Sequence, residues 1–570
     1  MAEEVWMLQT KKADFKQIGA RFRIDPVTAR IIRNRGIEGE AAIDRYLNGT
    51  LDDLYDPMLL KDMERAVSIL CEAVDTGKKI RIVGDYDIDG VCSTYILLQA
   101  FERLGSDVDF EIPDRIKDGY GINESIIEQA HADGVELILT CDNGISAFHQ
   151  VELAKKYGMT VVITDHHEVP LDGEKEKIPP ADAVIDPKQA DCPYPFPEIC
   201  GAVVAYKLVQ VLYARRGVPR MEWLDLLEFA AIATVGDVMK LQDENRILVK
   251  YGLKKMAQTK NLGLRRLAEK NNLDLGAITA YHIGFVIGPC LNAGGRLKTA
   301  KEALALLRAQ SEEEAERLAE ELKELNDTRK DMTEQGTEAA KLQVESWYQK
   351  DKVLVVFLPE CHESLAGIIA GRLREYYQKP AIVLTRGEEA VKGSGRSIDE
   401  YHMFKKLTEV SDLLLKFGGH PLAAGLSLEE KNIDEFRRRL NENAGLTEED
   451  FKAKVWIDVP MPVGYVTERL VRELSCLEPF GQGNEKPLFA EKSLRIRASR
   501  VLGRNRNVVK MTLEETDGHA IEALYFGDGT AFEEERAGRR EIDVVYYPDI
   551  NEYNGRKTLQ AVIRRYKFRG

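Results

Sequence analysis

Residues 79–92 read KIRIVGDYDIDGVC, and this stretch decides the fold expected for the chain. An apolar, β-branched run ends at Gly84, and a pattern typical of a helix begins near Gly90. A strand followed by a tight turn and a helix is the first half of a βαβ unit. Similar short apolar runs recur, with helical patterns in most of the gaps, at 107–113, 137–143, 160–167 and 182–187. The alternation predicts an α/β domain built on a parallel sheet.

Acidic residues and two histidines stand where these predicted strands and one later apolar helix end. They are Asp85, Asp87, Asp89, Asp142, Asp165, His166, His167, Glu168 and Asp237. In an open parallel sheet, ligands gather beyond the carboxyl ends of the strands. Carboxylates with one or two imidazoles suit Mn²⁺ or Mg²⁺ better than a structural Zn²⁺. The pattern predicts a dinuclear metal centre at this edge of the sheet.

The first acidic cluster has two simpler interpretations. An EF-hand calcium loop also begins DxDxDG, but it needs a glutamate at its twelfth position, which here is Ile96. It also needs a preceding helix, and here a strand precedes Asp85. A single Asp at a strand end is often only a helix cap. The recurrence of carboxylates at several strand ends favours the metal centre.

Four pieces of the chain resemble, in their order and intervals, the motif series of the DHH phosphoesterases: GDYDIDG (84–90), TCDNG (140–144), TDHHE (164–168) and ATVGD (233–237). The family takes its name from the motif at Asp165, His166 and His167. The resemblance implies that the metal ligands are Asp87, Asp89, Asp142, His166 and Asp237, with Asp142 bridging the two ions. It also implies that His167 and Asp165 lie among the ligands or just behind them.

The chain departs from the family pattern at one position. Some relatives carry a histidine where this chain has Val83. Asp85 is the candidate to replace it as a sixth ligand. The division of ligands between the two ions is left open by this departure.

The reaction implied by such a centre is phosphoester hydrolysis. Two nearby cations lower the pKa of a shared water and stabilise the attacking and leaving oxygens of an in-line displacement at phosphorus. The residues expected to act at the reacting centre are Asp142, His167 and Asp165. His167 is the candidate to stabilise charge on the phosphoryl oxygens.

The remaining chain predicts a bridging helix and two further domains. Residues 311–332, dense in charges and helix formers, predict one long exposed helix. Strand and helix patterns restart at 352–385 and predict a smaller α/β domain, and short strands from about 455 predict an OB-like β-barrel. The expected parts are an N-terminal helical extension (1–60), a DHH catalytic domain (61–310), the connecting helix (311–350), a DHHA1-type substrate-binding domain (351–454) and an OB-like nucleic-acid-binding domain (455–570).

Two glycine-rich segments are candidates to bind phosphate. NAGGRL (292–297) interrupts an otherwise helical region, and GSGRS (393–397) reads as a loop whose glycines allow close backbone approach. Arginine forks and backbone amides suit a phosphate, although either segment alone fits a glycine-rich turn with solvated arginines better. The second lobe, with its GGH at 418–420, is similar to the family's substrate-binding domain. That resemblance implies contacts to a terminal 5′-phosphate or to the nearby strand from Asn292, Arg296, Arg372, Ser394, Arg396 and His420.

The C-terminal region points to single-stranded DNA. LEPFGQGNEKPLF (477–489) and the β region are similar to the branch of the family that degrades single-stranded DNA from the 5′ end. Residues 495–507 and 562–570 are basic, with aromatic side chains nearby. Basic grooves with stacking aromatics suit single strands, although we expect at least half of these rings, Phe526, Tyr546, Tyr547 and Tyr553, to lie in the barrel core. The expected function is a Mn²⁺- or Mg²⁺-dependent 5′-to-3′ exonuclease that releases 5′-mononucleotides in DNA repair and recombination.

Composition is compatible with this interpretation. The chain has 570 residues and a net charge of −15, but much of the acidity lies in the connecting helix and at the metal site, so a basic channel is still possible. No apolar run approaches the ~20 residues of a membrane span, and the first residues lack a signal-peptide core. We therefore expect a cytoplasmic protein, a monomer, with single-stranded DNA, a helicase and a single-strand-binding protein as candidate partners.

Two alternative functions remain open at this point. The first is an oligoribonuclease or cyclic-dinucleotide phosphodiesterase with the same metal centre, but such relatives typically have the two lobes alone, without the β region. The second is a strand-binding scaffold that has lost its metals. Every assigned ligand position except that of Val83 is occupied, which disfavours the scaffold.

Overall fold

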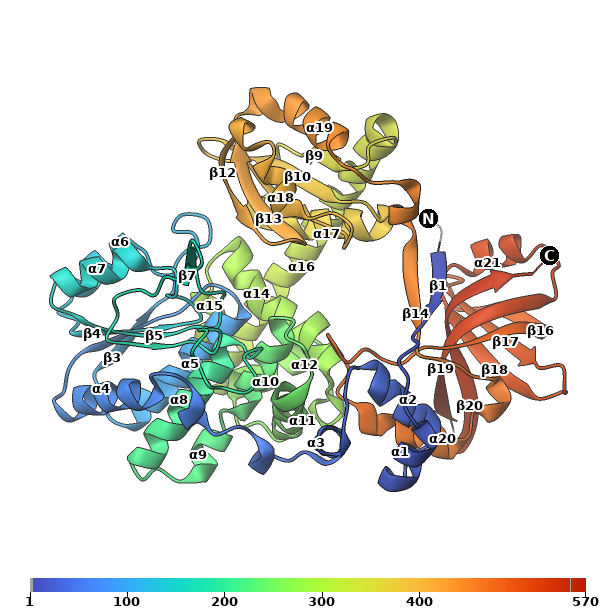
Figure 1. Ribbon diagram of the computed structural model, residues 1–570, viewed down its shortest axis with the longest axis horizontal. Helices are drawn as coiled ribbons and strands as arrows, with labels where there is room; N and C mark the ends of the chain where they lie inside the picture. Colours follow the sequence, from blue (N-terminus) through green and yellow to red (C-terminus); the bar gives the residue numbers. More distant parts are fainter. Residues whose placement is uncertain (1–3, 554, 570) are drawn as a thin grey trace. The chain divides into compact units, whose positions relative to one another are not determined.

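The computed structural model describes residues 4–553 and 555–569. The chain divides into two compact units, each described by itself below (Figure 1). Unit 1 comprises residues 54–239 and 247–453, and unit 2 comprises residues 4–53, 240–246 and those from 454 onward. No helix within the described residues is long and apolar enough to cross a lipid bilayer.

The predicted parallel sheet lies in unit 1, with strand order β3-β2-β4-β5-β8 and parallel pairing throughout. Its strands are β2 (Ile80–Val83), β3 (Val108–Glu111), β4 (Leu137–Cys141), β5 (Thr160–Thr164) and β8 (Ala183–Ile185). Figure 1 shows helices on both faces, among them α4 (Met63–Asp75), α6 (Glu124–Ala132), α7 (Phe148–Lys156) and α8 (Gly201–Arg215). All residues of β2, β4 and β8 are buried, as expected for a sheet covered on both faces.

Helices follow the sheet in the chain, and one of them corrects the prediction for NAGGRL. Residues 292–297 do not interrupt the helical region, because they form the end of α14 (Gly288–Leu297). A Cβ on Gly295 would lie 2.3 Å from the backbone oxygen of Tyr86, so this glycine allows close packing rather than a loop. The neighbouring helices are α10 (Leu227–Gly236), α11 (Asp243–Met256), α12 (Leu262–Lys270), α13 (Ala280–His282), the π-helical turn η4 (Ile283–Ile287) and α15 (Lys301–Arg308).

The predicted long helix is confirmed as α16 (Glu312–Gln343), which is continuous over 32 residues. It is not exposed along its length, because Ala315, Leu318 and Leu322 are buried. It packs against α12, α14 and α15 and, further along, against α17 (Glu363–Tyr377). This helix therefore joins the two lobes of unit 1 through packing as well as through the chain.

The second lobe is the smaller α/β domain that the sequence predicted. Its sheet has the order β12-β13-β11-β10-β9, and only β9 and β10 are parallel. GSGRS does not form the expected loop, because most of it lies in strand β11. The strands are β9 (Leu354–Phe357), β10 (Ala381–Arg386), β11 (Val391–Arg396), β12 (Leu414–Gly419) and β13 (Ala423–Leu428).

Unit 2 contains the predicted OB-like barrel. Its six-stranded sheet has the order β15-β16-β17-β18-β20-β19 and closes through pairing of β16 with β19. The strands are β15 (Val459–Pro460), β16 (Phe489–Leu502), β17 (Val508–Glu514), β18 (Ala520–Phe526), β19 (Glu541–Tyr553) and β20 (Arg556–Phe568). The helices α2 (Pro26–Asn34) and α3 (Glu40–Asn48) contribute Ile31, Ile43 and Tyr46 to the hydrophobic core of the barrel.

A buried arginine ties three segments of unit 2 together. Arg246 is 2% exposed, and its guanidinium donates to the backbone oxygens of Tyr46 at 3.0 Å, Leu477 at 2.8 Å and Cys476 at 2.7 Å. It also stacks on the Tyr46 ring, with its Cζ 4.0 Å from the ring centre. The arginine thus joins α3 to the short helical turn Ser475–Leu477 through buried hydrogen bonds.

Replacing this arginine should destabilise unit 2. Arg246→Ala removes three buried hydrogen bonds to backbone oxygens and the contact with the Tyr46 ring, so we expect a loss of about 3 kcal/mol in the free energy of unfolding. Differential scanning calorimetry measures it. Arg504→Ala, at an exposed position of the same unit, should change the stability by less than about 0.5 kcal/mol. Equal unfolding temperatures for the two variants would contradict this role.

Candidate metal centre

The first ligand candidates come from the turn between β2 and α5 (Ile88–Arg103). Asp87 is the N-cap of α5, and its Oδ1 accepts hydrogen bonds from the amides of Asp89 at 2.9 Å and Gly90 at 3.1 Å. A side chain at Gly90 would lie 2.4 Å from the backbone oxygen of Asp85, so only glycine fits there. Helix capping and metal binding are therefore compatible, because the same tight turn caps α5 and carries the candidate ligands.

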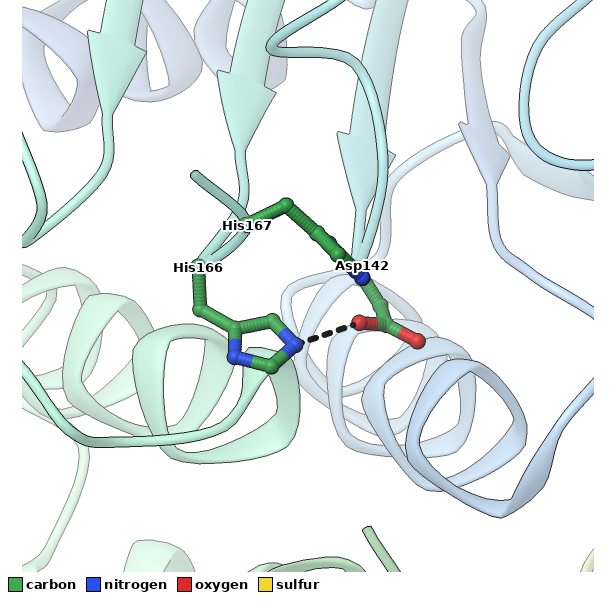
Figure 2. Close-up of side chains that lie close together, drawn as sticks. All are labelled: Asp142, His166 and His167. Carbon is green, nitrogen blue, oxygen red and sulfur yellow. Dashed lines mark ion pairs between the residues drawn. The ribbon is translucent and has the colours of Figure 1, made fainter. Parts of the chain in front are cut away.

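The other candidates come from the ends of β4, β5 and α10. Asp142 follows β4 with a φ of 61°, His166 follows β5, and Asp237 is the C-cap of α10. His166 Nε2 lies 3.1 Å from Asp142 Oδ1, 3.4 Å from Asp89 Oδ2 and 3.8 Å from Asp237 Oδ2. Figure 2 shows the His166 ring directed at the Asp142 carboxylate. Elements far apart in the chain thus converge on one imidazole.

The ligand atoms form three overlapping groups, and within each group they lie within 4.8 Å of one another. The groups are Asp85 with Asp87 and Asp142, Asp89 with His166 and Asp237, and Asp142 with His166 and His167. Asp142 and His166 each belong to two groups, an arrangement compatible with Asp142 as a bridge. All six predicted ligands lie together, Asp85 among them.

Burial and mutual repulsion make this cluster costly without cations. Burial and then the charge of Asp87 raise the pKa of Asp85 to about 8, and burial with the charges of Asp89 and Asp87 raises the pKa of Asp237 to about 8. Among the described residues, the buried Oδ2 of Asp85 has no hydrogen-bond partner. Burial lowers the pKa of His166, so this imidazole is neutral and keeps a lone pair. Such oxygens and a neutral imidazole fit Mn²⁺ or Mg²⁺.

Asp165 and His167 form a pair behind the ligands. Asp165 Oδ1 lies 2.8 Å from His167 Nδ1 and also accepts the amides of His166 and His167. Its Oδ2 accepts the Ile145 amide at 2.9 Å. Burial alone would lower the pKa of His167, but the hydrogen bond to Asp165 and the surrounding carboxylates raise it to about 9. His167 is therefore a cation at neutral pH, held in one orientation by Asp165.

Tyr120 contacts this pair. The sequence analysis did not identify it as a site residue. Its hydroxyl donates to the backbone oxygen of Asp142 at 2.7 Å and lies 2.9 Å from His167 Nδ1. The adjacent Gly121 donates its amide to Asp85 Oδ1 at 3.1 Å. The position of Tyr120 between two glycines after the carboxyl end of β3 is a sequence feature that could have indicated a site residue. Only the tertiary structure shows that Tyr120 contacts His167.

An arginine-lined cavity of about 320 Å³ also lies in unit 1. Arg296 from α14, Arg396 from β11 and Arg115 from the segment after β3 line it. Arg296 Nη1 donates to the backbone oxygen of Ser364 at 2.9 Å. Burial, followed by the charge of Arg115, lowers the pKa of Arg296 to about 10, and the same two causes lower that of Arg396. Partly buried guanidinium groups that repel one another are typical of an anion site.

The cavity brings together three of the six residues predicted to contact the 5′-phosphate or the nearby strand, and it adds one further residue. Those predicted and present are Arg296, Ser394 and Arg396. Arg115 was missed, although it is a basic residue just beyond a predicted strand end. Its Cζ lies 4.6 Å from the centre of the Tyr86 ring, and Tyr86 belongs to the turn that carries the first ligand aspartates. The cavity is therefore next to the metal-ligand turn.

Three other predicted contacts lie outside this cavity. Asn292 is half-buried on α14 and is not among the lining residues. Arg372 lines a separate groove along α16 and α17. His420, just after β12, lies near Glu168, whose pKa is lowered first by a hydrogen bond from Lys188 and also by the charge of His420. His420 therefore acts electrostatically on Glu168, the residue that directly follows the Asp-His-His motif.

Comparisons with known proteins identify the family. Three family models match successive parts of the chain: the DHH family, N-terminal domain (79–234), the DHHA1 domain (350–445) and the RecJ OB domain (457–565). The single-stranded-DNA-specific exonuclease RecJ of Escherichia coli (strain K12) is 34% identical over 563 residues, which are 95% of this chain and 95% of that protein. The chain belongs to the RecJ family. RecJ of Bacillus subtilis (strain 168) is 36% identical over 98% of this chain and 70% of its own length.

Solved RecJ structures confirm the predicted architecture. RecJ from Thermus thermophilus in complex with Mn²⁺ has a TM-score of 0.84 at 28% identity, covering 99% of this chain and 80% of that one. Its complex with Mg²⁺ has a TM-score of 0.78 at 27% identity, covering 99% of this chain and 78% of that one. The ions in these RecJ structures, Mn²⁺ and Mg²⁺, are the two that we predicted from the carboxylate and imidazole side chains.

The stability of this RecJ-family chain without metal should fall as the pH rises. Carboxyls whose pKa is raised from 3.8 to about 8 stabilise the folded state while protonated, and that stabilisation is lost as the pH rises through about 8. We expect the unfolding temperature in a chelator to drop between about pH 5 and 8, and Mn²⁺ to restore more of it at higher pH. Thermal unfolding with EDTA or Mn²⁺ across this range measures both effects.

Two variants serve as controls for this measurement. Asp142→Ala should lose most of the Mn²⁺-dependent increment. Asp172→Ala, at an exposed position of β6 (Leu171–Asp172), should retain all of it. A Mn²⁺ increment that is the same at every pH would refute the electrostatic argument.

Proposed function

We propose that the chain is a metal-dependent exonuclease that hydrolyses phosphodiester bonds of single-stranded DNA from the 5′ end and releases 5′-mononucleotides. The observation that carries this proposal is the arginine-lined cavity beside the metal-ligand turn, linked to it through Tyr86. A terminal phosphate bound in the cavity would present the first phosphodiester bond to the metal ligands. The relatives named above carry the name single-stranded-DNA-specific exonuclease, which supports this assignment.

The residues of unit 1 suggest how hydrolysis would proceed. Asp85, Asp87, Asp89, Asp142, His166 and Asp237 would hold two Mn²⁺ or Mg²⁺ ions, which supply an activated water and stabilise charge at phosphorus. Protonated His167 would donate a hydrogen bond to a phosphoryl oxygen. The hydrogen bond between its Nδ1 and Asp165 keeps the imidazole charged and oriented for this. Tyr120 would hold the His167 ring against rotation.

The arginine-lined cavity would determine where the strand is cut. Three guanidinium groups and the Ser394 hydroxyl suit the doubly charged phosphate at a 5′ end better than an internal, singly charged phosphodiester. Because the cavity is next to the turn of Asp85 and Asp87, a bound terminus fixes the register of cleavage. A register set from the 5′ end makes the enzyme an exonuclease with 5′-to-3′ polarity.

Unit 2 supports a single-stranded nucleic-acid substrate. Strand β16 and the turn after it carry Arg495, Arg497, Arg500, Arg504 and Arg506, and Phe526 at the end of β18 is 60% exposed. Two other aromatic side chains of this region, Tyr546 and Tyr547, are buried in the barrel. Basic side chains with few exposed rings favour contacts to the DNA backbone, which do not depend on sequence.

The proposed cellular role is DNA repair and recombination. A single-strand exonuclease needs an unwound strand, so a helicase and a single-strand-binding protein are the proposed partners. We further propose that the protein acts in the cytoplasm. We propose a monomer because unit 1 alone contains both the ligand cluster and the arginine-lined cavity.

Digestion of a 3′-labelled single-stranded DNA with Mn²⁺ tests the proposal directly. The same strand as duplex, as RNA and as di- to pentanucleotides is digested in parallel. We expect shortening from the 5′ end on the long single strand only, abolished by a chelator. Asp142→Ala should abolish cleavage while leaving DNA binding largely intact. Cleavage confined to the shortest pieces or to RNA would favour an oligonucleotide phosphodiesterase instead.

Arg115 should contribute to recognition of the 5′-phosphate. Loss of one charge-assisted contact in a partly buried site costs about 1.5–3 kcal/mol, so Arg115→Ala should lower kcat/KM on 5′-phosphorylated strands by about 10- to 100-fold. Strands with a 5′-hydroxyl should be affected much less. Arg386→Ala, an exposed arginine paired with Glu430 in the same lobe as Arg396, is the matched control. An equal loss on both kinds of strand would argue against a phosphate contact.

A further inference from the structure

The arginine-lined cavity is larger than the terminal phosphate that the proposed function places in it. Its volume of about 320 Å³ corresponds to about ten water molecules. A phosphate group, with one phosphorus and three terminal oxygens, would displace about three of these waters. Most of the cavity is therefore left for a further part of the strand end.

One face of β11 carries polar side chains along this cavity. Arg396, Ser394 and Lys392 all line it, and alternate residues of a strand point to the same face. A Cβ on Gly367 would lie 3.0 Å from Arg396 Nη2 and 3.4 Å from Ser394 Oγ, so these two side chains lie together beside Gly367. Lys392 lies two residues from Ser394, which is about 6.6 Å further along the strand. The row of polar groups thus continues beyond the proposed phosphate contacts.

Helix α17 places Lys392 at the same displacement. Glu363 and Gly367 both line the cavity, and four residues of a helix advance by about 6 Å. Lys392 Nζ lies 2.9 Å from Glu363 Oε2, one helical turn from Gly367. The strand and the helix therefore agree that an ammonium group lies in a part of the cavity that the terminal phosphate does not fill.

The two ends of the cavity differ in their surroundings. At one end, Arg115 lies on the Tyr86 ring, beside the turn that carries the first candidate metal ligands. At the other end, the Lys392 side chain is 47% exposed, so this end reaches solvent. A strand end bound among the arginines can therefore extend towards Lys392 without moving the bond that faces the metal ligands.

We propose that the cavity accepts single strands that begin with a 5′-triphosphate. This inference rests on the proposed function. The α-phosphate would occupy the position of a terminal monophosphate, and the β- and γ-phosphates would lie towards Lys392. Lys392 would then exchange the Glu363 carboxylate for a phosphate, a group that lysine binds well as a point charge. Such ends arise where a polymerase starts a strand on a nucleoside triphosphate.

Hydrolysis of such a strand gives a distinctive first product. Water bonds to the phosphorus of the first internucleotide phosphodiester, and the bond from this phosphorus to the 3′ oxygen of the first nucleotide breaks. That oxygen takes up a proton and leaves as part of a nucleoside 5′-triphosphate, while the remaining strand carries a 5′-phosphate. The anhydride bonds of the triphosphate stay intact, so every later cycle releases a nucleoside monophosphate.

The test uses 3′-labelled single-stranded DNA of one sequence with a 5′-triphosphate, a 5′-monophosphate or a 5′-hydroxyl. Each strand is digested with Mn²⁺, and the released nucleotides are separated by anion-exchange chromatography. We expect the triphosphate strand to be digested, with a nucleoside 5′-triphosphate as its first product. Resistance of this strand, or a nucleoside monophosphate as its first product, would overturn the inference.

Two variants of the cavity should shift the preference between strand ends in opposite directions. The quantity compared is the ratio of kcat/KM on the triphosphate strand to kcat/KM on the monophosphate strand. Lys392→Ala removes a half-exposed ammonium group and should lower this ratio by about 3- to 30-fold. Glu363→Gln removes the carboxylate that competes for Lys392 and should raise it by about 2- to 5-fold.

Lys431→Ala is the matched control in the same lobe. Its side chain is 76% exposed and pairs with Glu429, so this variant should leave the ratio unchanged. A ratio that neither Lys392→Ala nor Glu363→Gln alters would contradict the assignment of this end of the cavity to the β- and γ-phosphates.

Binding in EDTA, where no strand is cut, distinguishes failure of this inference from failure of the proposed function. If the protein digests neither strand but binds the triphosphate strand more tightly, and Lys392→Ala removes the difference, the exonuclease function fails while recognition of the triphosphate end stands. Digestion of the monophosphate strand alone would support the exonuclease and overturn this inference. Inhibition by free tripolyphosphate, with triphosphate strands left intact, would indicate a site for free polyphosphate and would also overturn it.

Discussion

Repulsion among buried carboxylates is the constraint on which the structure of unit 1 depends. Two like charges about 4 Å apart repel by about 4 kcal/mol at the effective dielectric of a protein surface, a large part of the stability of a whole domain. This repulsion acts among carboxylates that lie close together, those of Asp85, Asp87, Asp89, Asp142 and Asp237. Backbone amides offset part of it, since Asp87 caps α5 and Asp89 accepts the first amides of α8. Divalent cations are the natural way to offset the remainder.

The same sheet edge that gathers the carboxylates also determines what lies around them. The segment after β3 carries Arg115 and Tyr120. It therefore places a guanidinium group in the arginine-lined cavity and a hydroxyl group against His167. Helix α14 packs on the ligand-bearing turn through Gly295 and carries Arg296 into the cavity. The second lobe completes the cavity from β11 with Ser394 and Arg396. The candidate metal site and the proposed site for a strand end are thus consequences of one packing arrangement.

The two glycine-rich segments show where a reading of sequence is least reliable. Glycine usually indicates a turn, and NAGGRL and GSGRS were interpreted accordingly, yet one ends a helix and the other forms a strand. In α14 the glycine is required because the backbone of Tyr86 lies where a Cβ would be, and in β11 a Cβ on Gly393 would lie 2.5 Å from Leu384. Arg296 and Arg396, which the family resemblance assigned to one phosphate, nevertheless line one cavity.

The sequence by itself determined the parallel sheet, the connecting helix, the second lobe, the barrel and the six ligand candidates. Strand periodicity and carboxylates at strand ends are local signals, and the topology of a parallel sheet brings such ends together. Only the tertiary structure decided the placement of Arg115 and Tyr120, and it separated Arg372 and Asn292 from the arginine-lined cavity. A single arginine or aromatic ring carries no local signal of its partner, because side-chain contacts across elements depend on how the helices and strands pack.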